Sequence, residues 1–95
     1  MPDVRDNAEE SRLEIVEDQG TAVLEYREDG GTLALTHTGV PKAFEGQGYG
    51  AALVRAALAK ARAANLSVLP YCPYAKSWIE KHPEEAEGVT LLPLA

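Results

Sequence analysis

Apolar and polar side chains alternate in three stretches of the first forty residues. The positions that share the more apolar face are Leu13 and Ile15 in residues 12–17, Ala22, Leu24 and Tyr26 in residues 21–27, and Leu33, Leu35 and His37 in residues 32–38. A period of two is typical of β-strands with one buried face. Turn sequences containing Asp and Gly separate the stretches, so the pattern predicts an antiparallel meander of three strands.

The periodicity becomes helical in the second half of the chain. Pro41 ends the third strand because it has no N–H for the ladder. Apolar positions three and four apart predict a helix over residues 51–64, and residues 66–70 are typical of a short buried strand. A second helix is expected between Pro73 and Pro83. A strand–helix–strand path implies a parallel crossover, so we predict an α/β (α+β) fold in which a meander precedes β-α-β-α.

The length of 95 residues is that of a single domain, residues 1–95. The predicted core covers about residues 12–83. Residues 84–95 are first acidic and then apolar, and the pattern leaves open whether they form a last edge strand or a packed tail. No repeat or low-complexity linker divides the chain.

Composition and charge narrow the classes of function. Fifteen acidic against nine basic residues give a formal charge of −6, which disfavours binding to a phosphate backbone. No apolar run approaches the ~18–20 residues of a membrane span, and the acidic first ten residues are unlike a signal peptide. Cys72 is the single cysteine, and no Cys/His cluster has metal-ligand spacing. We expect a cytoplasmic protein with no nucleic-acid partner, no membrane partner and no metal.

A glycine-rich stretch, Gly46-Gln47-Gly48-Tyr49-Gly50, precedes the first predicted helix. Free N–H groups and the helix dipole make such a place favourable for an anion, and Gly48 and Gly50 have no β-carbon to hinder a phosphate. Because the donors are backbone amides, this site is compatible with a negative net charge. A glycine turn without a ligand is the alternative. The phosphate-loop and dinucleotide patterns are excluded by their spacing.

Four blocks of sequence resemble the GNAT superfamily of acetyl-CoA-dependent N-acetyltransferases, and most of all its minimal stand-alone members. The blocks are His37-Thr38-Gly39-Val40-Pro41, Glu45-Gly46-Gln47-Gly48-Tyr49-Gly50, Pro70-Tyr71-Cys72-Pro73-Tyr74 and Trp78-Ile79-Glu80-Lys81-His82-Pro83. The resemblance implies a V-shaped cofactor cleft and transfer of an acetyl group from acetyl-CoA (CoA) to an amine acceptor, a small molecule or a protein. An alternative is a CoA-binding or acyl-CoA-binding module with little or no catalytic activity.

The resemblance also implies which residues contact the cofactor. They are Val40, Gly46, Gln47, Gly48, Tyr49, Gly50, Cys72 and Lys76. In this family the glycine-stretch amides hold the CoA pyrophosphate, and the strand ending at Val40 pairs with pantetheine. Lys76 would meet CoA phosphates, or it is a solvated lysine. Glu45 stands where the family has Arg or Gln, and we expect it to point away from the phosphates.

The catalytic residues depart from the family pattern. Ile79 occupies the position of the tyrosine that protonates the leaving thiolate, and isoleucine cannot donate a proton. Cys72 lies at the predicted cap of the second helix, where the dipole favours a thiolate, so it is a candidate general acid or nucleophile. A buried thiol under pantetheine is the alternative. His37 is a candidate base or a core histidine. Tyr71 and Tyr74 line the mouth of the site or serve packing.

Overall fold

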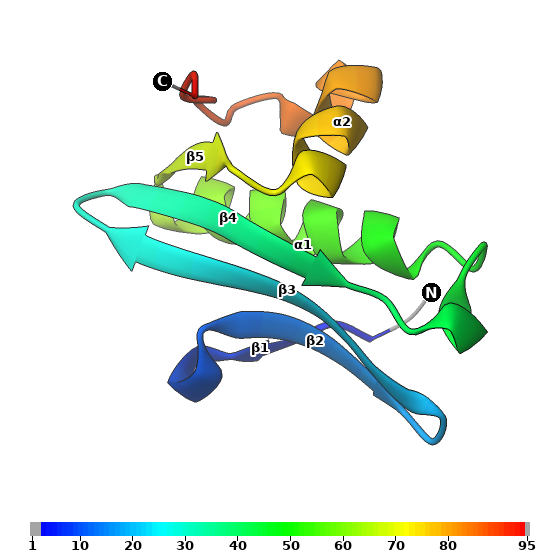
Figure 1. Ribbon diagram of the computed structural model, residues 1–95. Coiled ribbons are helices and arrows are strands. Elements are labelled where there is room, and N and C mark those ends of the chain that lie inside the picture. The colour runs from blue at the N-terminus through cyan, green and yellow to red at the C-terminus, as the bar shows by residue number, and fades with distance from the viewer. Residues whose placement is uncertain (1–2, 95) are drawn as a thin grey trace.

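The computed structural model describes residues 3–94, which form a five-stranded sheet and two α-helices (Figure 1). The elements are β1 (Arg5–Asn7), β2 (Arg12–Glu17), β3 (Gly20–Asp29), β4 (Thr32–Gly39), α1 (Tyr49–Ala64), β5 (Ser67–Pro70) and α2 (Pro73–Lys81), with 3-10 helices at Ala8–Glu10, Lys42–Phe44 and Pro83–Ala86. The strand order is β1-β2-β3-β4-β5, and only β4 and β5 are parallel. The predicted meander followed by β-α-β-α is confirmed.

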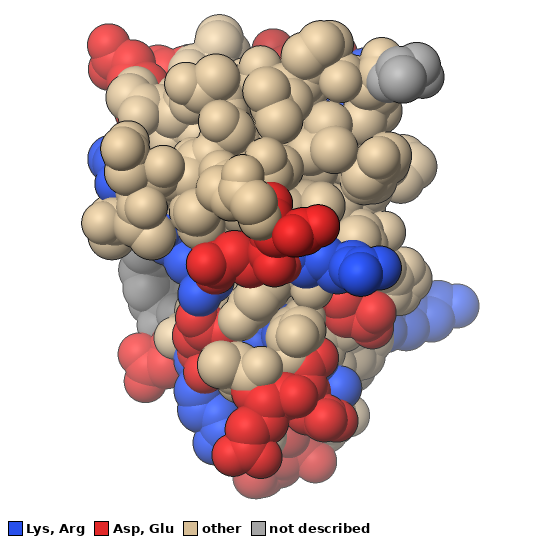
Figure 2. Space-filling model, turned by 90° about the vertical axis from the view of Figure 1, so that its left-hand side faces the viewer, with Lys and Arg blue, Asp and Glu red and all other residues tan. Residues whose placement is uncertain are grey.

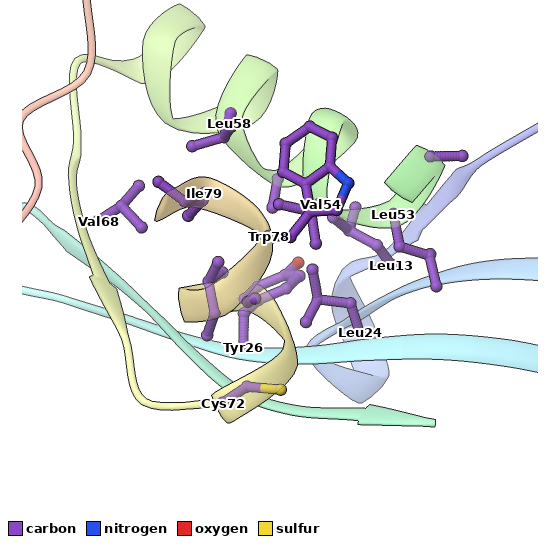
Figure 3. Close-up of a cluster of buried hydrophobic side chains, with 14 of the residues drawn as sticks. Leu13, Leu24, Tyr26, Leu53, Val54, Leu58, Val68, Cys72, Trp78 and Ile79 are labelled. Carbon is purple, nitrogen blue, oxygen red and sulfur yellow. The ribbon is translucent and has the colours of Figure 1, made fainter. Parts of the chain in front are cut away.

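One cluster of buried side chains joins the sheet to both helices. α1 contacts β2 to β5, and α2 packs against α1, β4 and β5. Figure 3 shows members of this cluster: Leu13, Leu24, Tyr26, Leu53, Val54, Leu58, Val68, Trp78 and Ile79. The alternating positions of β2 and β3 and the helical positions of α1 and α2 therefore meet in one aliphatic core, as their periodicities predict.

The short strand β1 was not predicted, and ion pairs hold it to the sheet. The Glu14 carboxylate of β2 is only 2% exposed and accepts from Arg5 at 2.8 Å and from Arg12 at 2.9 Å. Its hydrogen bond with Arg12 lowers the pKa of Glu14 against the opposing effect of burial. Because a buried carboxylate needs partners, the polar sequence of β1 is what makes it fit this place.

A second link joins β1 to β3 and α1. Asp6 accepts a hydrogen bond from the Tyr26 hydroxyl at 2.5 Å and forms an ion pair with Lys60 at 2.8 Å. The Lys60 ammonium also lies over the Tyr26 ring, 5.0 Å from its centroid. One carboxylate therefore connects an edge strand, a central strand and the helix that covers them.

A β-bulge interrupts the pairing of β3 with β4. Glu25 lies opposite His37, whereas the next residue, Tyr26, lies opposite Leu35, so Thr36 has no partner across the ladder. The Thr36 hydroxyl donates to the Glu25 carbonyl at 3.2 Å. One extra residue on β4 reverses which face the following side chains occupy.

The bulge corrects the expected place of His37. The prediction that His37 shares a face with Leu33 and Leu35 is wrong, because it lies opposite the exposed Glu25 and is itself exposed. The next residue, Thr38, lies opposite the buried Leu24 and therefore on the helix-covered face. Because of the bulge, Thr38 rather than His37 lies on the inner face of the sheet.

The sheet opens between β4 and β5. Their pairing ends at Leu35 and Pro70, while β4 stays paired with β3 as far as Gly39. The Cys72 N–H makes one further bond to the Leu35 carbonyl, at 2.8 Å. Beyond that point the edge of β4 has no partner from β5, which gives the V-shaped opening expected from the sequence.

The carboxyl-terminal residues lie along the free edge of β5. Val68 forms a parallel bridge with Leu91, and it exchanges hydrogen bonds of 2.8 Å with Thr90 and Leu92. This bridge answers the alternative left open by the sequence: the tail pairs with the sheet without forming a full strand. Figure 2 looks at this side of the molecule, where mostly uncharged residues cover the upper part and acidic and basic side chains lie together below. Within residues 3–94, no helix is long and apolar enough to cross a membrane.

Candidate functional site

A pocket of about 450 Å³ lies where β4, the glycine stretch and α2 meet. Its lining residues are Thr38, Val40, Phe44, Glu45, Gly46, Gly48, Tyr49, Gly50 and Tyr74. This volume is within the range of small-molecule sites, about 300–1,000 Å³. The pocket brings Val40 together with four residues of the predicted glycine stretch, as the resemblance implies.

The amino terminus of α1 presents free N–H groups at this pocket. Gly48 is the N-cap residue, and the first helical bond runs from the Ala52 N–H to the Gly48 carbonyl at 3.0 Å. The N–H groups of Tyr49, Gly50 and Ala51 precede that bond, so the helix itself supplies no acceptor for them. No acidic residue stands in the first turn. The helix dipole and these amides together favour an anion.

Gly46 and Gly48 are glycines for conformational reasons. Their φ angles are 77° and 78°, in the region that side-chain-bearing residues rarely adopt. A β-carbon built at either position meets no atom within 4 Å. The space above both residues is therefore open to a ligand.

Gln47 does not serve the pocket in the way expected from the sequence. Its backbone N–H donates to the Phe44 carbonyl at 3.3 Å, and its side-chain amide donates to the Ala43 carbonyl at 3.1 Å. Both donors close the turn after the 3-10 helix Lys42–Phe44 and are already used. Gln47 is also not among the residues that line the pocket, and its contact with the cofactor stays a prediction.

Glu45 lies on the pocket wall. It is one of the lining residues and is exposed, and the expectation that its side chain points away from the phosphates stays a prediction. A carboxylate repels an anionic ligand that lies within the screening length of about 8–10 Å.

Cys72 lies at the narrow end of the opening. It is the N-cap residue of α2, as predicted, and is 4% exposed. Its thiol makes no capping bond and instead lies 3.0 Å from the Thr38 hydroxyl, with either atom able to donate. Because Thr38 lines the pocket, this contact connects the buried thiol to the cleft.

Ile79 and Lys76 lie away from the pocket. Figure 3 shows Ile79 directed toward Leu58 and Val68 in the core, and it is 4% exposed. Lys76 pairs with Glu80 at 2.9 Å and borders a different hollow. Two residues along a helix correspond to a rotation of about 200°, so Lys76 points away from the side on which Tyr74 lines the pocket. The structure does not bring Lys76 to the cleft.

Tyr74 is the functional candidate that the sequence did not distinguish from a packing residue. It stands in the first turn of α2, is 44% exposed and lines the pocket opposite α1. The sequence does contain one signal for this role: Tyr74 follows Cys72 by two residues. Two residues correspond to about 200° around a helix, so the two side chains point in different directions. Tyr71, at 57% exposure, borders another hollow beside Leu69.

Comparison with known proteins agrees with this geometry. Residues 12–88 match the protein family described as GCN5-related N-acetyl-transferase. Among solved structures, the chain is similar to a GCN5-like protein from Staphylococcus aureus determined by NMR in solution, with a TM-score of 0.74 and 28% sequence identity over 98% of this chain and 90% of that one. The search of curated proteins finds no match.

Proposed function

Since the chain belongs to the family of GCN5-related N-acetyltransferases, we propose that it binds acetyl-CoA in the cleft between β4 and β5 and transfers the acetyl group to an amine. One observation carries this proposal. The first turn of α1, whose N–H groups have no acceptor within the helix, lines the same pocket as the end of β4 that is not paired with β5. The acceptor is a small-molecule or protein amine.

The residues present fit the cofactor. The amides of Tyr49, Gly50 and Ala51 would hold the pyrophosphate, and the open space above Gly48 leaves room for it. The end of β4 from Thr38 to Val40 would take the pantetheine arm along its free edge. When bound, acetyl-CoA supplies an activated acetyl group. Amide donors aimed at a carbonyl oxygen are the usual electrostatic aid to acyl transfer.

Cys72 and Thr38 form a hydrogen-bonded pair beside the cleft, and Thr38 lines the pocket. A nucleophilic role for Cys72 requires its sulfur to meet the thioester, and at 4% exposure the thiol is covered. Proton donation through the Thr38 hydroxyl requires no such exposure, because the two atoms already share a hydrogen bond of 3.0 Å. The Thr38 hydroxyl would give a proton to the leaving CoA thiolate and take one from the Cys72 thiol, and Cys72 would regain the proton that the amine loses. We therefore assign Cys72 and Thr38 to proton transfer. His37 lies on the outer face and has no part in this relay.

A CoA-binding module without catalysis is the second candidate function. The position of Ile79 favours it, since this residue is buried in the core and offers no proton to a leaving thiolate. The two functions share the cofactor and differ in whether CoA is released when an amine is added.

Two measurements test the proposal. Acetyl-CoA at about one hundred times its Kd should stabilise the protein by about 2.7 kcal/mol, seen as a higher melting temperature. No shift at millimolar acetyl-CoA would overturn cofactor binding. In the second, free thiol is followed during incubation with acetyl-CoA and a panel of amines. Release above the blank supports the transferase, whereas binding without release for every amine supports the module.

A further inference from the structure

Gly50 is a glycine for a different reason from its neighbours. It lies inside α1, and its φ is outside the left-handed region that explains Gly46 and Gly48. Glycine is disfavoured in helices, by about 1 kcal/mol relative to alanine in a helix interior, and Gly50 is the second residue of α1. A β-carbon at Gly50, however, would stand 2.5 Å from the Tyr74 hydroxyl oxygen and 2.7 Å from the adjacent ring carbon. The glycine therefore makes room for the phenol.

The hydroxyl of Tyr74 has no evident structural task. The hydroxyls of Tyr26 and Tyr49 donate to the carboxylates of Asp6 and Glu17. No such bond joins the Tyr74 hydroxyl to another protein group among the described residues 3–94. A phenylalanine ring would occupy the same place beside Gly50 except for the hydroxyl oxygen, so packing accounts for the ring and leaves the hydroxyl without a hydrogen-bonding role.

The surroundings keep this phenol a donor. Burial raises the pKa of Tyr74 and outweighs the opposing effect of the Arg55 charge, and Cys72 makes a smaller contribution that also raises the pKa. A phenol with a raised pKa is protonated at neutral pH and carries an O–H to donate. The hydroxyl stands beside the first turn of α1, whose amides are the anion-binding groups of the pocket.

We propose that the Tyr74 hydroxyl donates a hydrogen bond to the phosphate end of bound CoA, beside the amides of α1, and that Gly50 preserves the space for it. This inference rests on the proposed function. It adds a side-chain donor from α2 to a site otherwise made of backbone amides. The cofactor would thereby join the two helices across the opening of the sheet.

The test compares Tyr74→Phe with Tyr71→Phe, a control at an exposed tyrosine outside the pocket. Binding of CoA and of pantetheine, which lacks the phosphates, is measured by NMR titration. Loss of one hydrogen bond should raise the Kd for CoA about 3- to 10-fold in Tyr74→Phe and leave pantetheine binding unchanged. Tyr71→Phe should match the wild type with both ligands.

Each other outcome has a distinct meaning. An unchanged Kd for CoA in Tyr74→Phe overturns the inference, and an equal loss with pantetheine overturns the assignment to the phosphate end. Failure of the wild type to bind CoA at all refutes the proposed function instead. Gly50→Ala displaces the phenol, so its effect and that of Tyr74→Phe should be less than additive. Full additivity contradicts the shared role.

Discussion

Substitution of Gly48 by alanine, compared with the same substitution at Gly31, distinguishes the effect of backbone strain on stability from the effect on ligand binding. Both residues have a left-handed backbone, with φ angles of 78° and 83°, and a β-carbon at either meets no atom within 4 Å. Gly48 caps α1 in the pocket, whereas Gly31 lies in the β3–β4 hairpin loop. The pair therefore shares its conformational cost and differs in location.

The magnitude of that cost follows from the backbone. Alanine in the left-handed region costs about 1–2 kcal/mol, and loss of chain freedom in the unfolded state returns about 0.4–1 kcal/mol. Gly48→Ala and Gly31→Ala should each destabilise the protein by about 1 kcal/mol. For a domain of this size that is a fall of about 4–8 °C in melting temperature, measured by circular dichroism.

Addition of acetyl-CoA should then distinguish the two variants. At about one hundred times the wild-type Kd, the wild type and Gly31→Ala should both gain about 2.7 kcal/mol. In Gly48→Ala the new methyl group occupies the open space beside the amides. A tenfold weaker Kd would reduce the gain by about 1.4 kcal/mol. A full ligand-induced shift in Gly48→Ala would refute the placement of the anion at this helix terminus.

Three further predictions concern single side chains. Glu45→Gln should lower the Kd for acetyl-CoA several-fold at low salt, because it removes a negative charge from a residue that lines the pocket. An unchanged Kd in calorimetric titration would show that the carboxylate lies too far from the ligand to repel it. Thr38→Val should slow CoA release with an amine at least tenfold and leave the Kd for acetyl-CoA nearly unchanged, and retention of the full rate would remove the Cys72–Thr38 relay. Glu14→Gln should destabilise the protein at pH 7 and flatten its acid dependence in urea unfolding. The folded pKa of Glu14 is lowered, so its stabilisation is complete above the ordinary value of about 4.3 and is lost as the pH falls below it; an equally steep acid dependence in the variant would contradict this.

The sequence predicts what depends on periodicity and on glycine. Alternation in β2 and β3 and the helical spacing of α1 give the core, because burial selects side chains by face. The glycine stretch is identified as the start of the first helix and as a candidate anion site, although its sequence does not show that Gly46 and Gly48 have φ above zero. Cys72 is identified as a helix cap because Pro73 follows it.

The sequence does not predict what depends on a single unpaired residue or on a distant partner. The bulge at Thr36 leaves no mark in the alternation, yet it moves His37 to the outer face. The role of Gly50 depends on Tyr74, which lies more than twenty positions away in the chain. Such contacts arise only when α1 and α2 pack together, and neither helix encodes them alone.

The links made by β1 have a consequence for how this protein can be divided. A fragment that starts at residue 12, where the family match begins, would lack Arg5 and Asp6. Glu14 would lose a cation, and Tyr26 and Lys60 would lose the carboxylate they share. We expect such a fragment to be less stable than the full chain and to regain stability when a synthetic peptide of residues 3–11 is added. The peptide that contains β1 would then bind to the fragment as a separate chain, and its Kd for the fragment would measure the strength of these polar contacts.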